Sequence, residues 1–120
     1  MSHRRWTFFV ADIIDAVETI QSYCAGSGLD SFREDGKTLD AVERNFILIG
    51  EAAGHVPPEI VEKYSMVPWR EMRDMRNFAV HVYWGVKPEV LWETIQRDLP
   101  ALLPKLRAII ENEGLSLIHI

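Results

Sequence analysis

Four long segments of this chain share one periodicity, in which apolar residues recur every three or four positions. Such spacing places the apolar side chains on one stripe of an α-helix. The segments cover residues 6–25, 39–55, 68–84 and 88–114. Alternation of apolar and polar residues, which marks a half-buried strand, never persists. The sequence therefore predicts an all-α fold.

Local signals predict where the helices begin and end. Glycines in "AGSG" end the first helix, and Thr38 is the predicted N-cap of the second. Pro68 opens the third helix, which is predicted to run unbroken to Trp84. Pro100 and Pro104 are expected to bend or split the fourth.

The connections between these segments are short, and they contain only small helical elements. One helical turn is expected around Phe32, and "EIVEKY" is expected to form a short helix. Amphipathic helices joined in this way pack as antiparallel neighbours. We therefore expect residues 1–120 to form one domain, an antiparallel up-and-down four-helix bundle with an extra short helix.

Composition and charge limit the classes of function. A formal net charge of −5 argues against a broad, non-specific grip on nucleic acid, although a local basic patch remains open. Cys24 is the single cysteine, so a reducing cytoplasm is the expected compartment, and no zinc-binding spacing occurs. Asp12 and Asp15 interrupt the first apolar run, so we expect neither a signal peptide nor a membrane span. We also expect no metal and no cofactor.

The stretch "RNFAVHVYWG", residues 76–85, carries the candidate site: Arg76, Asn77, His81 and Tyr83. On one continuous helix Arg76 and His81 would point about 140° apart, because each residue advances about 100°. Spacing alone therefore does not bring the two side chains together. They would converge if the arginine curls around the helix, or if two copies of the helix face each other. The second arrangement predicts a symmetric homodimer with a shared polar cleft.

These residue types suit RNA cleavage without a metal. Histidine titrates near neutral pH and can both take and give a proton. Arginine presents a planar fork of donors to phosphate oxygens, and asparagine can orient the histidine or donate to the same oxygens. The nucleophile would be the 2′-hydroxyl, which distinguishes RNA from DNA.

Each residue also has an ordinary structural explanation. Arg73 and Arg76 alternate with acidic residues, which is equally typical of a solvated, salt-bridged helix face. A single histidine near a helix end is most often solvated, and Tyr83 fits a core or interface position. Spacing alone leaves both explanations open.

Two longer stretches, "AVERNFILIGEAA" and "MRNFAVHVYWGVKPEVLWETIQRDLPALLPKL", resemble the HepT-like family of HEPN domains. The family motif is an arginine followed by a polar residue, with a histidine five positions after the arginine and a tyrosine two positions after the histidine. Arg76, Asn77, His81 and Tyr83 match it. The motif is followed here by "WGV", and the similarity extends over nearly the whole chain.

The resemblance implies a homodimeric helical bundle that acts as a ribonuclease toxin. Its partner would be a nucleotidyltransferase-type antitoxin that blocks the cleft by adenylylating the motif tyrosine. On this chain Arg76 and His81 would be catalytic and Tyr83 would be the modified residue. Many members have an acidic residue where this chain has Val82, which puts its regulation in question.

Three further residues are candidates for supporting roles. Arg44 and Glu51 lie seven positions apart, and therefore on one face of the second helix, and Arg73 precedes the motif by one turn. Arg44 and Glu51 could equally form a surface pair worth little energy. The alternative function is a non-catalytic dimer whose cleft binds a nucleotide or the nucleotidyltransferase partner.

Overall fold

The computed structural model describes residues 5–78 and 86–114, and the described chain is helical throughout apart from turns and short connections. This confirms the all-α prediction. The elements in chain order are α1 (Arg5–Cys24), α2 (Leu29–Glu34), α3 (Gly36–Gly54), α4 (Pro58–Lys63), α5 (Trp69–Asp74), the 3₁₀ helix η1 (Met75–Asn77), α6 (Pro88–Glu93), the π-helical turn η2 (Thr94–Asp98) and α7 (Leu99–Asn112). That residues 1–120 form a single domain stays a prediction.

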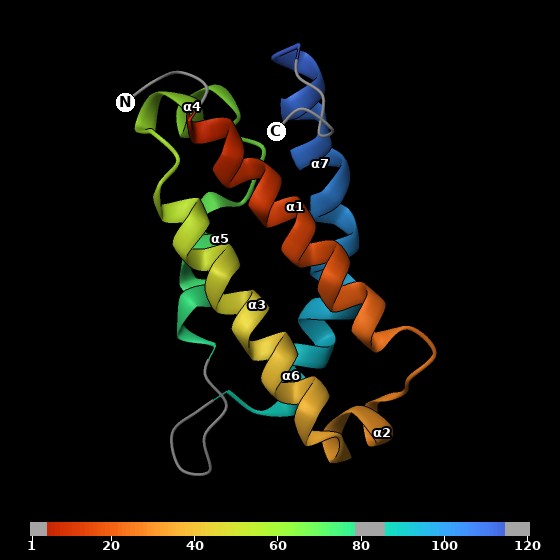
Figure 1. Ribbon diagram of the computed structural model, residues 1–120. Helices are drawn as coiled ribbons and strands as arrows, with labels where there is room; N and C mark the ends of the chain where they lie inside the picture. Colours follow the sequence, from red (N-terminus) through yellow and green to blue (C-terminus); the bar gives the residue numbers. More distant parts are fainter. Residues whose placement is uncertain (1–4, 79–85, 115–120) are drawn as a thin grey trace.

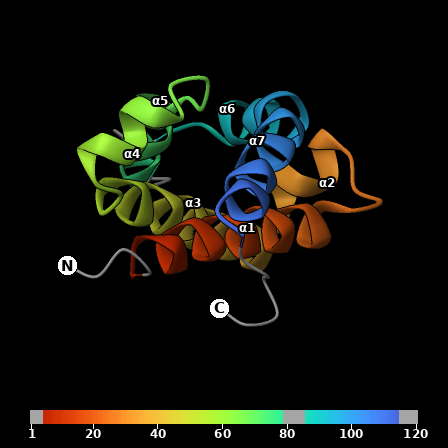
Figure 2. The ribbon, with the colours of Figure 1, turned by 90° about the horizontal axis from the view of Figure 1, so that it is seen from above.

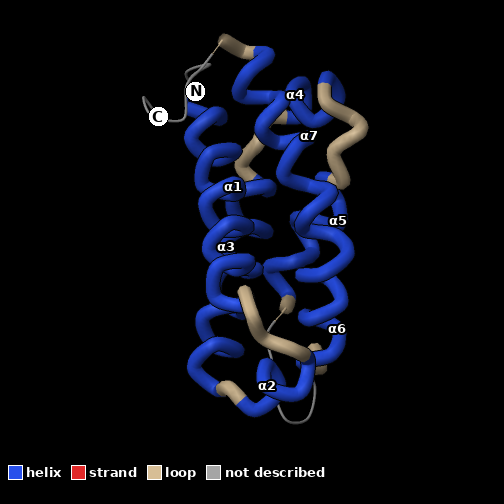
Figure 3. The backbone as a smooth tube through the Cα atoms, turned by 90° about the vertical axis from the view of Figure 1, so that its right-hand side faces the viewer, coloured by secondary structure: helices blue, strands red, loops and turns tan. Residues whose placement is uncertain are grey.

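The helices form an antiparallel up-and-down bundle with two layers. α1 and α3 lie side by side in one layer, and α5–η1 and α6–α7 form the other (Figures 1 and 2). α5 and η1 pack on α3, whereas α7 packs on α1. The short helices α2 and α4 lie at opposite ends of the bundle (Figure 3). The predicted bundle is therefore confirmed, while the homodimer stays a prediction.

The apolar stripes read from the sequence form the core. Each helix of the bundle turns its stripe inward, and the largest side chains that are almost fully buried include Trp6, Phe32, Phe46, Ile13, Ile49, Met72, Leu91, Leu99, Leu106 and Ile109. Burial of one such side chain contributes about 1.5–3 kcal/mol. Within residues 5–78 and 86–114, no helix has the length and apolar character needed to span a bilayer.

The predicted N-cap of α3 was wrong by three residues. Asp35, not Thr38, caps the helix: its Oδ1 accepts the backbone N–H of Thr38 at 3.1 Å, and its Oδ2 accepts the Thr38 hydroxyl at 2.6 Å. These hydrogen bonds hold the pKa of Asp35 below its ordinary value, because they stabilise the carboxylate. Thr38 thus serves as the donor to the cap, and Gly36 and Lys37 join the helix.

The third helix is much shorter than predicted. α5 ends at Asp74, and one 3₁₀ turn follows, closed by the Phe78 N–H donating to the Met75 carbonyl at 3.0 Å. Phe78 then leaves helical geometry, with φ −81° and ψ 46°. The angle predicted between Arg76 and His81 assumed one continuous helix, so it does not apply to this backbone.

The start of α5 is fastened to its neighbours. Trp69 is buried, and its indole N–H donates to the Tyr64 carbonyl at 3.0 Å. The Tyr64 hydroxyl donates to the Glu113 carboxylate at the end of α7, and Lys63 pairs with the same carboxylate at 3.0 Å. These contacts tie the start of α5 to the end of α7.

The fourth segment absorbs its prolines without breaking. α6 continues through η2 into α7, where the Leu99 N–H donates to the Thr94 carbonyl in the wider π pattern. Pro100 is the second residue of α7, which directly follows the π turn, and Pro104 lies inside the helix. The segment was expected to bend or split, and a local π turn takes the place of a break.

Candidate functional site

The first half of the predicted site lies on η1. Arg76 and Asn77 are its last two residues, and both are exposed. Met75, the first residue of η1, is buried against the core, which anchors the turn from the inside. η1 therefore presents Arg76 and Asn77 to solvent at the point where the chain leaves helical geometry.

Arg73 on α5 and Arg76 on η1 have no acidic partner among the described residues. Arg73 on α5 is exposed like Arg76, and within the described part of the chain neither guanidinium forms a hydrogen bond or ion pair. Nor is any ion pair formed there by Glu71 or Asp74. In the described chain this face is thus solvated but not salt-bridged. Unpaired guanidinium groups suit binding of phosphate oxygens.

Arg44 and Glu51 lie on the exposed side of α3. Neither forms an ion pair with any residue that the structure describes. Arg44 lines a shallow depression together with Asp40, Glu43 and Ile47, where it lies among acidic residues. Their supporting role stays a prediction, and neither side chain forms an ion pair or hydrogen bond with a described residue.

The second half of the predicted site lies outside the described residues. His81 and Tyr83 fall within residues 79–85, as do Val82 and Trp84. The pairing of Arg76 with His81, and the position of Tyr83 beside them, therefore stay predictions.

Sequence reasoning missed the residues that hold η1. Gly50 on α3 is buried, and a methyl group added to its Cα would lie 2.3 Å from the backbone nitrogen of Arg76 and 2.7 Å from its Cβ. One turn earlier on α3, the Phe46 ring contacts the Phe78 ring, with centroids 5.2 Å apart. A glycine in the interior of a helix costs about 0.5–1 kcal/mol relative to alanine. This glycine in "LIGEAAG" was therefore the available signal of a close backbone contact.

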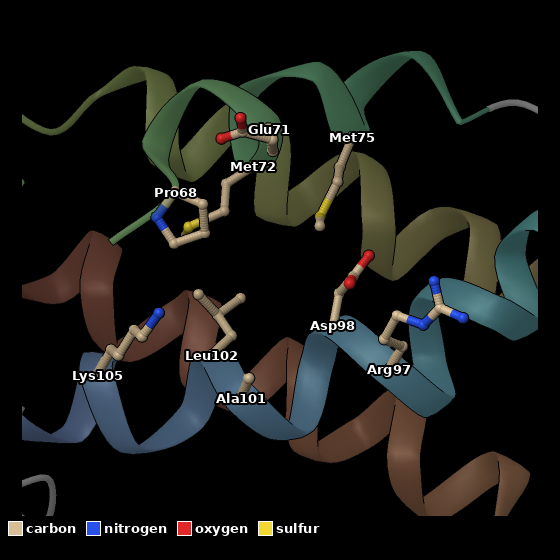
Figure 4. Close-up of a pocket in the computed structure, with 9 residues that line it drawn as sticks. All are labelled: Pro68, Glu71, Met72, Met75, Arg97, Asp98, Ala101, Leu102 and Lys105. Carbon is tan, nitrogen blue, oxygen red and sulfur yellow. The ribbon is translucent and has the colours of Figure 1, made fainter. Parts of the chain in front are cut away.

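A separate cavity of about 270 Å³ lies between α5–η1 and the η2–α7 segment (Figure 4). Met75 and Asp98 extend into it from its two sides. Its charged lining consists of Glu71, Asp98, Arg97 and Lys105, two acids and two bases, and Arg76 is not among the lining residues. The balanced charge gives this cavity no net attraction for a phosphate group. In the chain that the structure describes, no three histidine, cysteine or acidic side chains are grouped to hold a metal ion.

Comparison with known proteins identifies the family. The family model described as "Ribonuclease HepT-like" matches residues 13–109, which is most of the chain. The chain belongs to the HepT-like ribonuclease family. The predicted family is therefore confirmed.

Several relatives of this HepT-like chain are also named as ribonucleases. A "Probable ribonuclease HepT" of Thermococcus cleftensis is 36% identical over 101 residues, covering 84% of this chain and 92% of the relative. A protein of Caldanaerobacter subterraneus subsp. tengcongensis named "Putative RNase" is 32% identical, covering 88% of this chain and 94% of its own length.

One relative is larger. A Methanocaldococcus jannaschii protein named "Gamma-glutamylcyclotransferase and putative RNase" is 33% identical over 104 residues, which cover 87% of this chain but only 47% of that protein. No solved structure gave a significant match. The family and these names support the prediction that this chain is a ribonuclease.

Proposed function

We propose that this protein is a metal-independent endoribonuclease that serves as the toxin of a type II toxin–antitoxin pair in the cytoplasm. The observation that carries the proposal is Arg76: an exposed guanidinium without a partner in the described chain, on a turn held by α3, in a HepT-like sequence with His81 five positions later.

The proposed reaction is an internal transfer at the RNA backbone. A general base removes the proton of the 2′-hydroxyl, the 2′-oxygen forms a bond to the adjacent phosphorus, and the bond from phosphorus to the 5′-oxygen breaks. A general acid returns a proton to that leaving oxygen. His81 fills the acid–base role, since histidine is the side-chain type that can both accept and donate a proton near neutral pH. The Arg76 fork binds the phosphate oxygens and stabilises their extra charge in the transition state, with Asn77 donating to the same group.

The test of this proposal uses purified protein, free of any partner, on cellular RNA. Cleavage is expected to continue in EDTA and to leave 2′,3′-cyclic phosphate and 5′-hydroxyl ends, because the nucleophile belongs to the RNA itself. Loss of activity on chelation, or 3′-hydroxyl ends, would replace this mechanism with metal-assisted hydrolysis by water.

We propose that the active form is a two-fold homodimer with the motif segments of both copies lining one cleft. The family resemblance supports this arrangement. The angle between Arg76 and His81 on one continuous helix no longer contributes support, because η1 ends at Asn77. Light scattering at micromolar concentration should give twice the monomer mass of 13.8 kDa. A monomer that still cleaves RNA would exclude a site shared between two copies.

The proposed partner is a nucleotidyltransferase-type antitoxin that transfers AMP from ATP to Tyr83. The tyrosine oxygen attacks the α-phosphorus, pyrophosphate leaves, and the attached AMP blocks the cleft. Incubation with the partner, ATP and Mg²⁺ should add the mass of one AMP group to the peptide that contains Tyr83, and RNA cleavage should stop. Full neutralisation of Tyr83→Phe under the same conditions would show that another residue or simple binding accounts for control.

A non-catalytic module is the second candidate, and the formal net charge of −5 favours it, because a polyanion such as RNA is repelled by an acidic protein. In that case the cleft binds a nucleotide or the nucleotidyltransferase partner without turnover. Equal RNA degradation by preparations of wild type and of the catalytic variants would select this candidate.

A further inference from the structure

We propose that Gly50, assisted by Phe46, is a positioning residue that fixes the Arg76 backbone at the active site. The inference rests on the proposed function only for its effect on cleavage. Its structural basis is the packing of η1 on α3. Gly50 contacts the backbone of Arg76, and Phe46, one helical turn earlier on α3, contacts the ring of Phe78.

The first contact is between two backbones. Gly50 lies in the interior of α3 rather than at a turn, and no positive φ explains the glycine. The atoms that a Cβ at this position would meet are the backbone nitrogen of Arg76 at 2.3 Å, its Cβ at 2.7 Å and its Cα at 2.8 Å. No side-chain rotation relieves contacts with these three atoms. The absence of a side chain at Gly50 is therefore what allows Arg76 to lie where it does.

The second contact holds the chain just beyond Arg76. Phe78 is partly buried against the core, and its ring packs on Phe46 at an interplanar angle of 55°. Tilted aromatic pairs of this kind are favourable. Arg76 is thus fixed by its own backbone on one side and by the ring of Phe78 two residues later, while its guanidinium remains exposed.

A methyl group at Gly50 would force the two backbones apart. Ordinary carbon contacts lie at about 3.5–4.0 Å, so η1 would have to move by about 1 Å. A displacement of this size in a catalytic group can reduce the rate about 10²-fold. Gly50→Ala is therefore expected to lower kcat for RNA cleavage about 10²-fold, with a smaller change in KM.

Gly54 provides the matched control. It lies in the same helix, one turn later, and an added Cβ there would meet nothing within 4 Å. Gly54→Ala makes the same chemical change in α3 and is expected to retain wild-type kcat. If both alanine variants lose activity equally, a change in α3 itself, rather than its contact with Arg76, is responsible.

A double-mutant cycle separates positioning from general damage. Gly50→Ala is measured for kcat and for melting temperature, in the wild type and in Arg76→Ala. If Gly50 acts through the guanidinium, its effect on kcat falls to less than about threefold in Arg76→Ala, since coupled residues are not additive. Its effect on melting temperature should be the same in both backgrounds, because the contacting backbone atoms remain. A full additional loss of kcat in Arg76→Ala would overturn the inference.

Two further measurements apply if Gly50→Ala does not fold or if the wild type does not cleave RNA. Should Gly50→Ala not fold, Phe78→Leu, which loosens the second contact, must lower kcat in the wild type but not in Arg76→Ala; an additive loss refutes the positioning role. Should wild type prove inactive on RNA, the proposed function fails, but the amide NMR signals of Arg76 and Asn77 still report on the contact. They must shift in Gly50→Ala and not in Gly54→Ala, and unchanged signals overturn the inference.

Discussion

Replacement of His81 by alanine is expected to slow RNA cleavage by ~10²–10⁴-fold, the usual effect of removing a general acid or base. The reason is chemical: alanine can neither accept the 2′-hydroxyl proton nor return a proton to the leaving 5′-oxygen. The measurement is the single-turnover rate on a defined RNA, together with the thermal unfolding of both proteins.

His55→Ala is the control for this experiment. His55 is an exposed histidine that follows α3 and stacks on Phe9, with ring centroids 4.8 Å apart. Its replacement removes one imidazole from the chain but none from the motif, so cleavage should be unchanged. Wild-type cleavage by His81→Ala would point to a contaminating nuclease or to a different site.

Replacement of Arg76 by alanine is expected to reduce cleavage by a similar ~10²–10³-fold, which is typical for loss of a group that stabilises transition-state charge. Stability should change little, because the side chain is exposed and forms no ion pair with the described residues. Arg76→Lys should recover only part of the activity, since an ammonium group cannot replace the planar fork of donors.

Arg70→Ala controls for net charge. Arg70 is exposed on the neighbouring helix α5, so its loss changes the overall charge by the same amount. A loss of activity in Arg70→Ala as large as that in Arg76→Ala would mean that electrostatic attraction of RNA, rather than a specific catalytic contact, explains both effects. Repetition at higher salt distinguishes the two explanations, because salt screens long-range attraction of RNA and leaves a direct contact with the phosphate less affected.

Local patterns were sufficient to predict the parts of the fold that depend on which side of a helix is apolar. The stripes of α1, α3 and α7 are buried as expected, and Met72 and Met75 also face the core. These features follow from a repeat of about 3.6 residues and need no knowledge of the neighbouring helices.

Contacts between residues distant in sequence were not predictable in the same way. The residues after Pro68 have a helical pattern, yet α5 ends at Asp74, and the residues that follow it contact Gly50 and Phe46 of α3. Tertiary packing commonly overrides local preference. The prediction of Thr38 as the N-cap of α3 was wrong for a local reason. Asp35, three residues earlier, carries a carboxylate that is at least as good a hydrogen-bond acceptor.

Within the site, the sequence predicts candidate residues, and that prediction stays open; it gives no indication of how Arg76 is held. Arg76 is exposed and forms no ion pair with the described residues, which is compatible both with binding of a ligand and with a solvated surface position. The residue that sets its position, Gly50, has no functional group, and its importance becomes visible only when the backbone it touches is known.

The π turn η2 has an evolutionary consequence. A residue inserted into or removed from a loop changes little, but in a continuous helix it rotates everything beyond it by about 100° and shifts it by about 1.5 Å. Between α6 and α7 the wider turn at Thr94–Asp98 accommodates an additional residue while Leu91 and Leu99 both remain buried. Single-residue gaps between family members near this turn would therefore mark the gain or loss of the π geometry, with the core-facing side of α7 preserved on both sides of the gap.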